Sequence, residues 1–126
     1  MHIPEDLKYS KDHEWVRLSG KVARVGITDY AQDALGDVVF VQLPSSGTVV
    51  SAGQSCSEVE STKSVSDIYV PVSGSIINVN NLLSESPNLI NSDPYGEGRI
   101  MEIEVSDLSS VAELLDASTY RQFIEG

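Results

Sequence analysis

The sequence predicts a mainly β protein, a sandwich or a flattened barrel, with short helices at its periphery and at its C-terminal end. Many short runs of apolar and β-branched residues are separated by turn residues. Two central runs lie on either side of Lys63, with Gly53 and Gly74 at nearly equal distances from it, which indicates one long hairpin. The last residues form helical patterns that are too short to be stable alone, so we expect them to pack on the sheet.

Local signals place the elements of the N-terminal half. Thr28 is a suitable cap for a short helix and Gly36 is a suitable end for it. The run 37–43 is continuously apolar and β-branched, which predicts a well-buried strand. The predicted elements are, in order, strands His13–Leu18 and Lys21–Ile27, helix Asp29–Leu35 and strand Asp37–Leu43.

The C-terminal half continues with strands and closes with helices. Met101, Ile103 and Val105 fall on one face of the last strand and are predicted to point to the core. Asp107 and Ser109-Ser110 are candidate caps for the first helix of the tail, and Ser118 or Thr119 for the second. The predicted elements are strands Gln54–Glu60, Ser66–Val70, Ser75–Val79 and Arg99–Val105, followed by helices Val111–Leu115 and Tyr120–Ile124.

Charge and cysteine content exclude several classes of protein. The net charge of −11 repels phosphate backbones, so no nucleic-acid partner is predicted, and it favours partners with basic docking patches. With Cys56 as the single cysteine, neither an internal disulfide nor a thiolate metal site can form, and no metal site is predicted. The apolar runs are too short to cross a membrane and the first residues show no targeting pattern, so we expect a cytoplasmic protein without a membrane partner.

The sequence lacks the local motifs of a catalytic site. The histidines are His2 and His13, and His13 is expected to be a surface strand residue. Cys56 is expected to be a small, partly buried strand residue rather than a nucleophile. No phosphate-binding loop is present, because Gly96-Glu97-Gly98 lacks the remainder of a dinucleotide pattern. The chain is therefore not predicted to be an enzyme.

Lys63 has the surroundings that a carrier lysine requires. Its neighbours Ser61, Thr62 and Ser64 are small and polar, so a modifying enzyme can reach its amine. The two strand-like arms fix the base of the side chain while the amine remains free to move. A lysine in a turn is usually only a solvated charge, so this pattern alone leaves the function open.

The residues around Lys63 resemble the lipoylation region of the glycine cleavage system H protein family. The segment Glu60–Tyr69, followed by Pro71-Val72-Ser73-Gly74, carries the resemblance. Further blocks resemble other family signatures in the same order, so the resemblance runs from about Leu7 to Phe123. These blocks are Leu7–Ser10 with Asp12–Val16, Gly26–Gln32 with Leu35–Val39, and Asn88–Asn91 with Pro94, Tyr95 and Gly98.

The resemblance implies a lipoyl-domain-like flattened β-barrel or sandwich (a barrel-sandwich hybrid) with short peripheral and C-terminal helices. Residues 1–126 would form a single lipoyl-carrier domain, with 107–126 as a short helical C-terminal extension packed on it. Lipoate would be attached covalently to Lys63. The family also has acidic residues close to the cleft that shelters the arm, and Glu14 and Asp67 occupy those places.

The implied function is that of a non-catalytic carrier. A lipoyl-lysine arm would take the aminomethyl group of glycine from a pyridoxal-phosphate glycine decarboxylase to an aminomethyltransferase, and would then be reoxidised by dihydrolipoamide dehydrogenase. A lipoate ligase or lipoyltransferase would be a further partner, and a monomer is expected.

Other functions remain open at this point. The family usually has Trp after Gly98, where this chain has Arg99, and the family includes members that mainly donate lipoyl groups to other proteins. A biotin carrier is disfavoured, because its lysine normally lies between two methionines and Lys63 lies between Thr62 and Ser64. A lipoyl domain of a 2-oxoacid dehydrogenase complex would normally be linked to a catalytic domain. An unmodified acidic β-rich interaction module is a further alternative.

Overall fold

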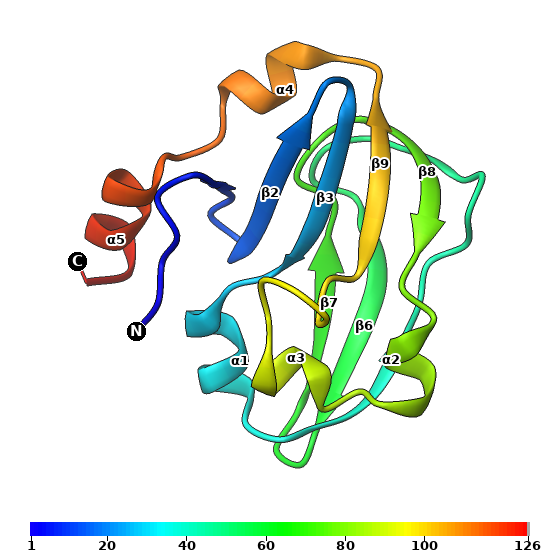
Figure 1. Cartoon of the computed structure of the whole chain (residues 1–126), viewed down its shortest axis with the longest axis vertical. Coiled ribbons are helices and arrows are strands. Elements are labelled where there is room, and N and C mark those ends of the chain that lie inside the picture. Colours follow the sequence, from blue (N-terminus) through cyan, green and yellow to red (C-terminus); the bar gives the residue numbers. More distant parts are fainter. Residues whose placement is uncertain (126) are drawn as a thin grey trace.

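The computed structural model describes residues 1–125, which form two antiparallel β-sheets with short helices around them (Figure 1). The strands are β1 (Lys8–Tyr9), β2 (Glu14–Ser19), β3 (Val22–Ile27), β4 (Val38–Gln42), β5 (Val49–Val50), β6 (Ser55–Ser61), β7 (Val65–Tyr69), β8 (Gly74–Val79) and β9 (Met101–Val105). The helices are α1 (Asp29–Leu35), α2 (Leu82–Glu85), α3 (Leu89–Ser92), α4 (Leu108–Ala112) and α5 (Ala117–Glu125). The predicted fold class is confirmed.

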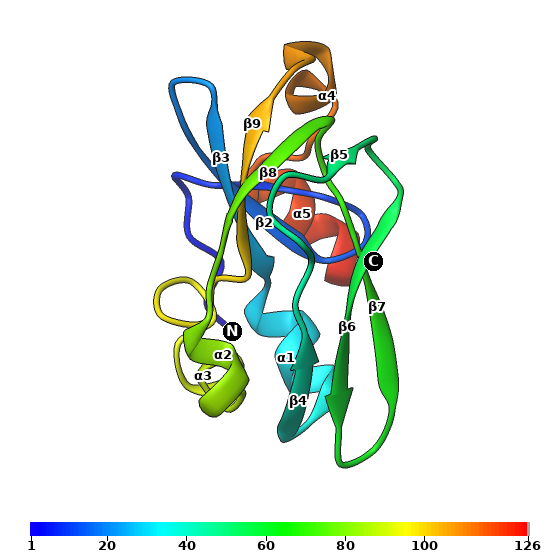
Figure 2. The same cartoon turned by 90° about the vertical axis from the view of Figure 1, so that its right-hand side faces the viewer.

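The two sheets face each other as layers. The larger has the strand order β1-β2-β3-β9-β8-β5, and the smaller has the order β4-β6-β7. Figure 2 shows the smaller sheet beside the larger one, with the β6–β7 hairpin extending to one end of the molecule and α1 between the layers near that end. The hairpin predicted around Lys63 is therefore present, with arms one residue displaced from the predicted bounds.

The main core lies between the sheets. Val25 and Ile103 of the larger sheet and Val59 of the smaller are all fully buried in it. Met101 and Val105 share the inward face with Ile103, as predicted from their alternation. This face-to-face packing supplies the apolar burial that the short helices cannot supply alone.

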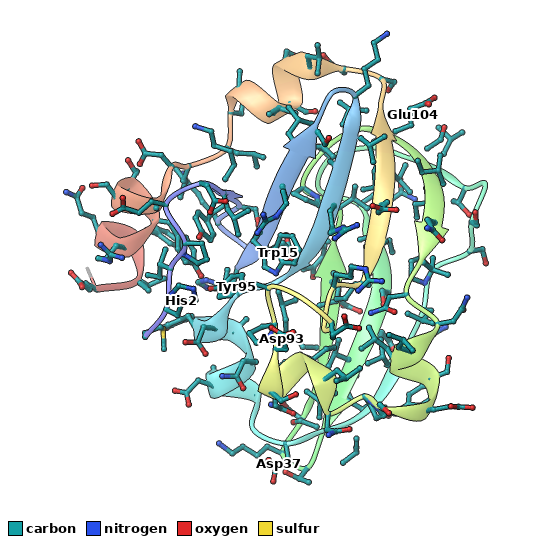
Figure 3. The ribbon with its side chains drawn as sticks, in the orientation of Figure 1. His2, Trp15, Asp37, Asp93, Tyr95 and Glu104 are labelled. Carbon is teal, nitrogen blue, oxygen red and sulfur yellow. The ribbon has the colours of Figure 1, made fainter. Side chains whose placement is uncertain are left out.

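A second apolar cluster covers the outer face of the larger sheet. Trp15 points outward where its neighbour Val16 points inward, and Trp15 packs with Tyr9 and Tyr120. Tyr9 and Tyr120 stack with ring centroids 4.6 Å apart, so α5 is held against the N-terminal segment. Helix α5 of the tail therefore packs on the larger sheet, as we expected for a helix too short to be stable alone. Figure 3 shows Trp15 beside Tyr95, near His2.

The structure corrects the prediction for strand 37–43. In β4, Val38 and Val41 are buried, whereas Val39 and Phe40 are about half exposed. A β-bulge between Val38 and Phe40 interrupts the pairing with β6, and β4 is an edge strand. The apolar run therefore does not reflect burial on both faces.

The tail helices begin earlier than predicted. Asp107 caps α4, as expected, but Ser109-Ser110 lie inside the helix. Ser118 and Thr119 lie inside α5 and do not cap it, and the side chain of Asp116 accepts a hydrogen bond from the Thr119 N–H at 2.8 Å. Asp116 precedes both predicted caps, and aspartate caps a helix as well as serine does and better than threonine, so the helix begins at Ala117.

Candidate functional site

Lys63 lies at the tip of the β6–β7 hairpin and is exposed. The hairpin closes with a backbone hydrogen bond of 2.8 Å from the Ser61 N–H to the Ser64 carbonyl. The Ser61 hydroxyl oxygen also accepts hydrogen bonds from the N–H groups of Lys63 and Ser64, each at 3.1 Å. These contacts fix the backbone of the tip, while the lysine itself remains exposed.

The tip is also attached to the end of α1. The Thr62 N–H donates to the carbonyl of Asp37 at 3.0 Å. The side chain of Lys63 runs over Gly36, since a Cβ at Gly36 would lie only 3.2 Å from its Cε. Gly36 has φ of 82° and ends the helix, so the turn that brings the chain under Lys63 requires glycine.

A cleft of about 250 Å³ lies between α1, the turn before β2, and β7. Ala31, Ala34 and Leu35 form its α1 side at the i, i+3, i+4 spacing of one helix face. The small alanines leave space that larger residues would fill. Its other lining residues are Asp12, His13, Ile27, Tyr30, Ser66, Asp67 and Ile68.

The two acids predicted near the arm are placed differently. Asp67 is exposed and lines the cleft, four residues along β7 from Lys63. Glu14 is 1% exposed and points between the sheets, since it shares the inward face of β2 with Val16. The cleft therefore contains Asp67 and also Asp12, which the sequence analysis did not single out.

Glu14 joins the two sheets through hydrogen bonds. Its carboxylate accepts from the Ser10 hydroxyl at 2.6 Å and from the Tyr69 N–H at 3.4 Å. Burial raises the pKa of Glu14 to about 7, because the hydrogen bonds from Ser10 and Tyr69 compensate only in part for the lost hydration. None of the ion pairs among residues 1–125 includes it. Glu14 is thus a buried carboxyl that gains or loses a proton near neutral pH.

His13 is not the surface strand residue that the sequence indicated. It lies in the turn before β2 with φ of 70°, half-buried, and forms part of the cleft wall. The Tyr120 hydroxyl lies 2.8 Å from His13 Nδ1 and 2.8 Å from the Thr28 hydroxyl. Burial lowers the pKa of His13, which favours the neutral ring.

The direction of these hydrogen bonds follows from burial. Thr28 is fully buried, and in the described part of the chain its hydroxyl has Tyr120 Oη as its hydrogen-bond acceptor. If Thr28 donates to Tyr120, then Tyr120 donates to His13 Nδ1, and the ring proton of His13 is on Nε2. Helix α5 thereby fixes the orientation of a side chain in the cleft wall.

The remaining candidate groups carry no site. Burial raises the pKa of the Cys56 thiol to about 12, so the thiol is not an activated nucleophile. Residues 1–125 contain no cluster of three or more His, Cys, Asp or Glu side chains placed to hold a metal ion. None of the described helices is both long and apolar enough to span a membrane.

Arg99 lies at the surface and not in a buried pocket. Its side chain is 29% exposed, and its Nη1 lies 3.9 Å from a carboxylate oxygen of Glu97. It lines a small polar cavity of about 80 Å³ together with Arg24. The cation is thus accommodated by exposure and by Glu97, without a buried unpaired charge.

The chain matches the family model described as glycine cleavage H-protein over residues 7–126. It is 59% identical over 124 residues to the glycine cleavage system H protein of Mycobacterium avium, covering 94% of both chains. It is 54% identical over 125 residues to that of Cronobacter sakazakii, covering 98% of this chain and 97% of the other.

A solved structure of the same family is also similar to this chain. The crystal structure of a glycine cleavage system H protein from Mycobacterium marinum superimposes with a TM-score of 0.90 and 46% sequence identity. The match covers 98% of this chain and 100% of that one. Sequence and fold therefore point to the same family over nearly the whole chain.

Proposed function

The chain belongs to the glycine cleavage H-protein family, and we propose that it carries the aminomethyl group of glycine on a lipoyl arm attached to Lys63. The family members are carriers of the glycine cleavage system and not catalytic subunits. The observation that carries the proposal is the position of Lys63, exposed at the tip of a fixed hairpin beside a cleft.

The residues present fit a lipoyl group. Asp67 lies four residues from Lys63, which corresponds to about 13 Å along a strand. The side chain of lipoyl-lysine is a chain of roughly a dozen bonds of about 1.5 Å each, which is long enough to cover that distance. The cleft of about 250 Å³ offers an apolar wall for the carbon chain and acids for its end. We propose that the arm folds back into this cleft.

Lipoate, when bound, supplies the dithiol and disulfide chemistry that takes up and releases the aminomethyl group. The protein supplies the pivot at Lys63, an apolar wall from Ala31, Ala34 and Leu35, and carboxylates that attract a protonated amine. Asp67 is the acid that such an amine can reach directly. Glu14 is 1% exposed, so the role proposed for it requires neighbouring side chains to move.

The proposed partners are those of the glycine cleavage system: a pyridoxal-phosphate glycine decarboxylase, an aminomethyltransferase and dihydrolipoamide dehydrogenase. An enzyme that attaches lipoate to Lys63 is a further partner. We propose that the chain acts as a single carrier unit and as a monomer, because a freely moving arm must visit several active sites in turn.

The test is modification and loading of the purified protein. Incubation with lipoate ligase, ATP and lipoate is expected to add one lipoyl group, mapped to Lys63 by peptide mass, and none to Lys63→Arg. Addition of glycine and the decarboxylase is then expected to load the arm, and Asp67→Asn is expected to shorten the lifetime of the loaded protein. A modified protein that is never loaded would favour a lipoyl donor, and an unmodified one would favour the interaction module.

A further inference from the structure

Three apolar side chains lie exposed beside Lys63. Val39 is 54% exposed, Phe40 is 51% exposed and Val65 is 58% exposed. Val65 follows Lys63 by two residues on β7, and Phe40 pairs with Glu60, which pairs in turn with Val65. With strands about 4.8 Å apart, this apolar patch (Val39, Phe40 and Val65) lies within about 10 Å of the hairpin tip.

The bulge in β4 creates this patch. Regular alternation would put Val38 and Val41 on opposite faces of the strand, but the bulge lets both be buried and leaves two consecutive residues, Val39 and Phe40, exposed between them. A bulge redirects side chains and is common next to functional sites. Leaving an aromatic ring in water forgoes the stabilisation of burying it, and aromatic residues are enriched where proteins meet.

The segments that carry the patch are rich in acids. Residues 37–69 contain four acids, namely Asp37, Glu58, Glu60 and Asp67, and Lys63 is their one lysine or arginine. The arginines Arg17 and Arg24 lie in the larger sheet. Glu60 lies between Phe40 and Val65 on the same face of the smaller sheet, so the surface around Lys63 combines exposed apolar side chains with acidic ones. Such a surface is complementary to one that combines apolar and basic side chains.

We propose that Val39, Phe40 and Val65 form the docking surface for the lipoate ligase that modifies Lys63, an inference that rests on the proposed function. Before modification, Nζ of Lys63 must itself enter the active site of the ligase, so the two protein surfaces meet at the hairpin tip. After modification, the reacting sulfur atoms stand up to about 10 Å beyond Nζ, because about seven of the dozen bonds of the arm lie past that atom, and enzymes that act on the sulfurs need not contact the patch. Because the patch lies close to Nζ, the ligase is the partner that we expect to contact it.

The patch takes no part in the bond changes. In the ligase reaction the neutral Nζ attacks the carbonyl carbon of enzyme-bound lipoyl adenylate. The new C–N bond replaces the C–O bond to AMP, AMP leaves with the bonding electron pair, and the nitrogen loses a proton to give the amide. Docking sets how often Nζ reaches the adenylate, so loss of the patch acts mainly on KM.

The test compares three substitutions that keep strand propensity. Phe40→Thr and Val39→Thr alter the patch, and Val49→Thr makes the same change at a 74% exposed valine of β5 in the other sheet. Lipoylation of each apo protein is followed by intact mass. Phe40→Thr is expected to lower kcat/KM by about tenfold or more, Val39→Thr by a few-fold, and Val49→Thr not at all.

The outcomes separate this inference from the proposed function. Wild-type protein that stays unmodified at Lys63 would refute both. Efficient wild-type modification with Phe40→Thr and Val39→Thr within about twofold of it would overturn the docking surface alone. If Phe40→Thr does not fold, Val39→Thr decides. Once lipoylated, the variants are expected to be reoxidised by dihydrolipoamide dehydrogenase at the wild-type rate, and an equal loss there would overturn the assignment to the ligase.

Discussion

At the scale of single residues, position relative to the two sheets decides what each acid can do. Glu14 and Asp67 are both carboxylates near the same cleft, yet one is 1% exposed and the other faces water. A carboxyl between the sheets has lost its hydration, and Glu14 forms no ion pair within residues 1–125, so its neutral form is favoured. Asp67 keeps its hydration and is available to a ligand. The resemblance assigned both acids to the surroundings of the cleft, but their burial depends on which face of each strand points inward.

The first prediction concerns Glu14→Gln. The pKa of Glu14 is raised from 4.5 to about 7 on folding, so its contribution to stability is full below pH 4.5 and is lost as the pH rises through 7. Glutamine resembles the protonated carboxyl and does not titrate. The variant is expected to match wild type near pH 4.5 and to exceed its unfolding free energy by up to about 3 kcal/mol at pH 8.5.

Urea unfolding at several pH values measures this difference. Glu113→Gln is the matched control, because Glu113 is exposed and the variant keeps Glu14, so its stability is expected to vary with pH as that of wild type does. A Glu14→Gln variant that is less stable than wild type at pH 8.5 would mean that the charged carboxylate is stabilising, contrary to the burial argument.

At the scale of elements, the outer apolar cluster depends on close packing of the Trp15 side chain against the backbone of β3. A Cβ at Gly26 would lie 2.7–2.8 Å from three atoms of the Trp15 indole. Trp15 is fully buried, and its Nε1 donates to the Pro94 carbonyl at 2.9 Å, so the ring cannot move aside easily. Glycine at position 26 is thus needed for the fit of β3 beneath Trp15.

Gly26→Ala is therefore expected to destabilise the fold by about 1–3 kcal/mol through overpacking. Introduced into a Trp15→Leu background, which removes the crowded indole, the same change is expected to cost much less. Thermal or urea unfolding of the four proteins in this cycle gives the coupling energy. Equal costs in both backgrounds would show that the indole is not what excludes a side chain at position 26.

Helix α5 depends on a buried hydroxyl. Tyr120→Phe removes the group that satisfies both Thr28 and His13, and Thr28 has no exposure through which water could replace it. We expect the unfolding free energy to fall by about 1–3 kcal/mol. The pKa of His13, followed by NMR, is expected to change as well. Tyr69→Phe, at a half-buried tyrosine of β7, is the control, and an unaltered His13 titration in Tyr120→Phe would contradict the proposed orientation of the ring.

Elements with strong local signals were predicted well from the sequence, and elements set by distant contacts were not. Thr28 and Gly36 define α1 at both ends by their own chemistry, and the prediction of helix 29–35 is confirmed. The prediction that strand 37–43 is well buried was wrong. The edge position of β4 and its bulge arise from how β4 pairs with β6, which the residues of the strand alone do not reveal. The resemblance implied a cleft near Lys63, but most of its lining residues could not be identified from local patterns, since its walls come from three segments that meet only in the folded protein.

At the scale of the whole molecule, charge is distributed unevenly. The net charge of the chain is −11. Arg17 and Arg24 lie in the larger sheet, whereas the smaller sheet and the segment that joins α1 to it carry acids around Lys63. Figure 3 shows Asp37 at the hairpin end of the molecule and Glu104 at the opposite end. A carrier that must meet several enzymes gains from such a field, because long-range attraction raises encounter rates without making the complexes long-lived.

The last prediction uses these two ends. The kcat/KM of a partner reaction at limiting carrier is expected to fall severalfold as ionic strength rises from about 0.01 M to 0.5 M, because the screening length shrinks from about 30 Å to a few Å.

Asp37 and Glu104 are both exposed, so Asp37→Asn and Glu104→Gln each change the net charge by one unit. If steering acts on the hairpin end, Asp37→Asn lowers kcat/KM at low salt and flattens its salt dependence, whereas Glu104→Gln has a smaller effect. Above about 0.5 M salt the kcat/KM values of the three proteins are expected to converge, because each charge is then screened within a few Å and no longer acts on a distant partner. Equal effects of the two substitutions would show that net charge alone matters, and a flat salt response in wild type would assign recognition to short-range apolar contacts.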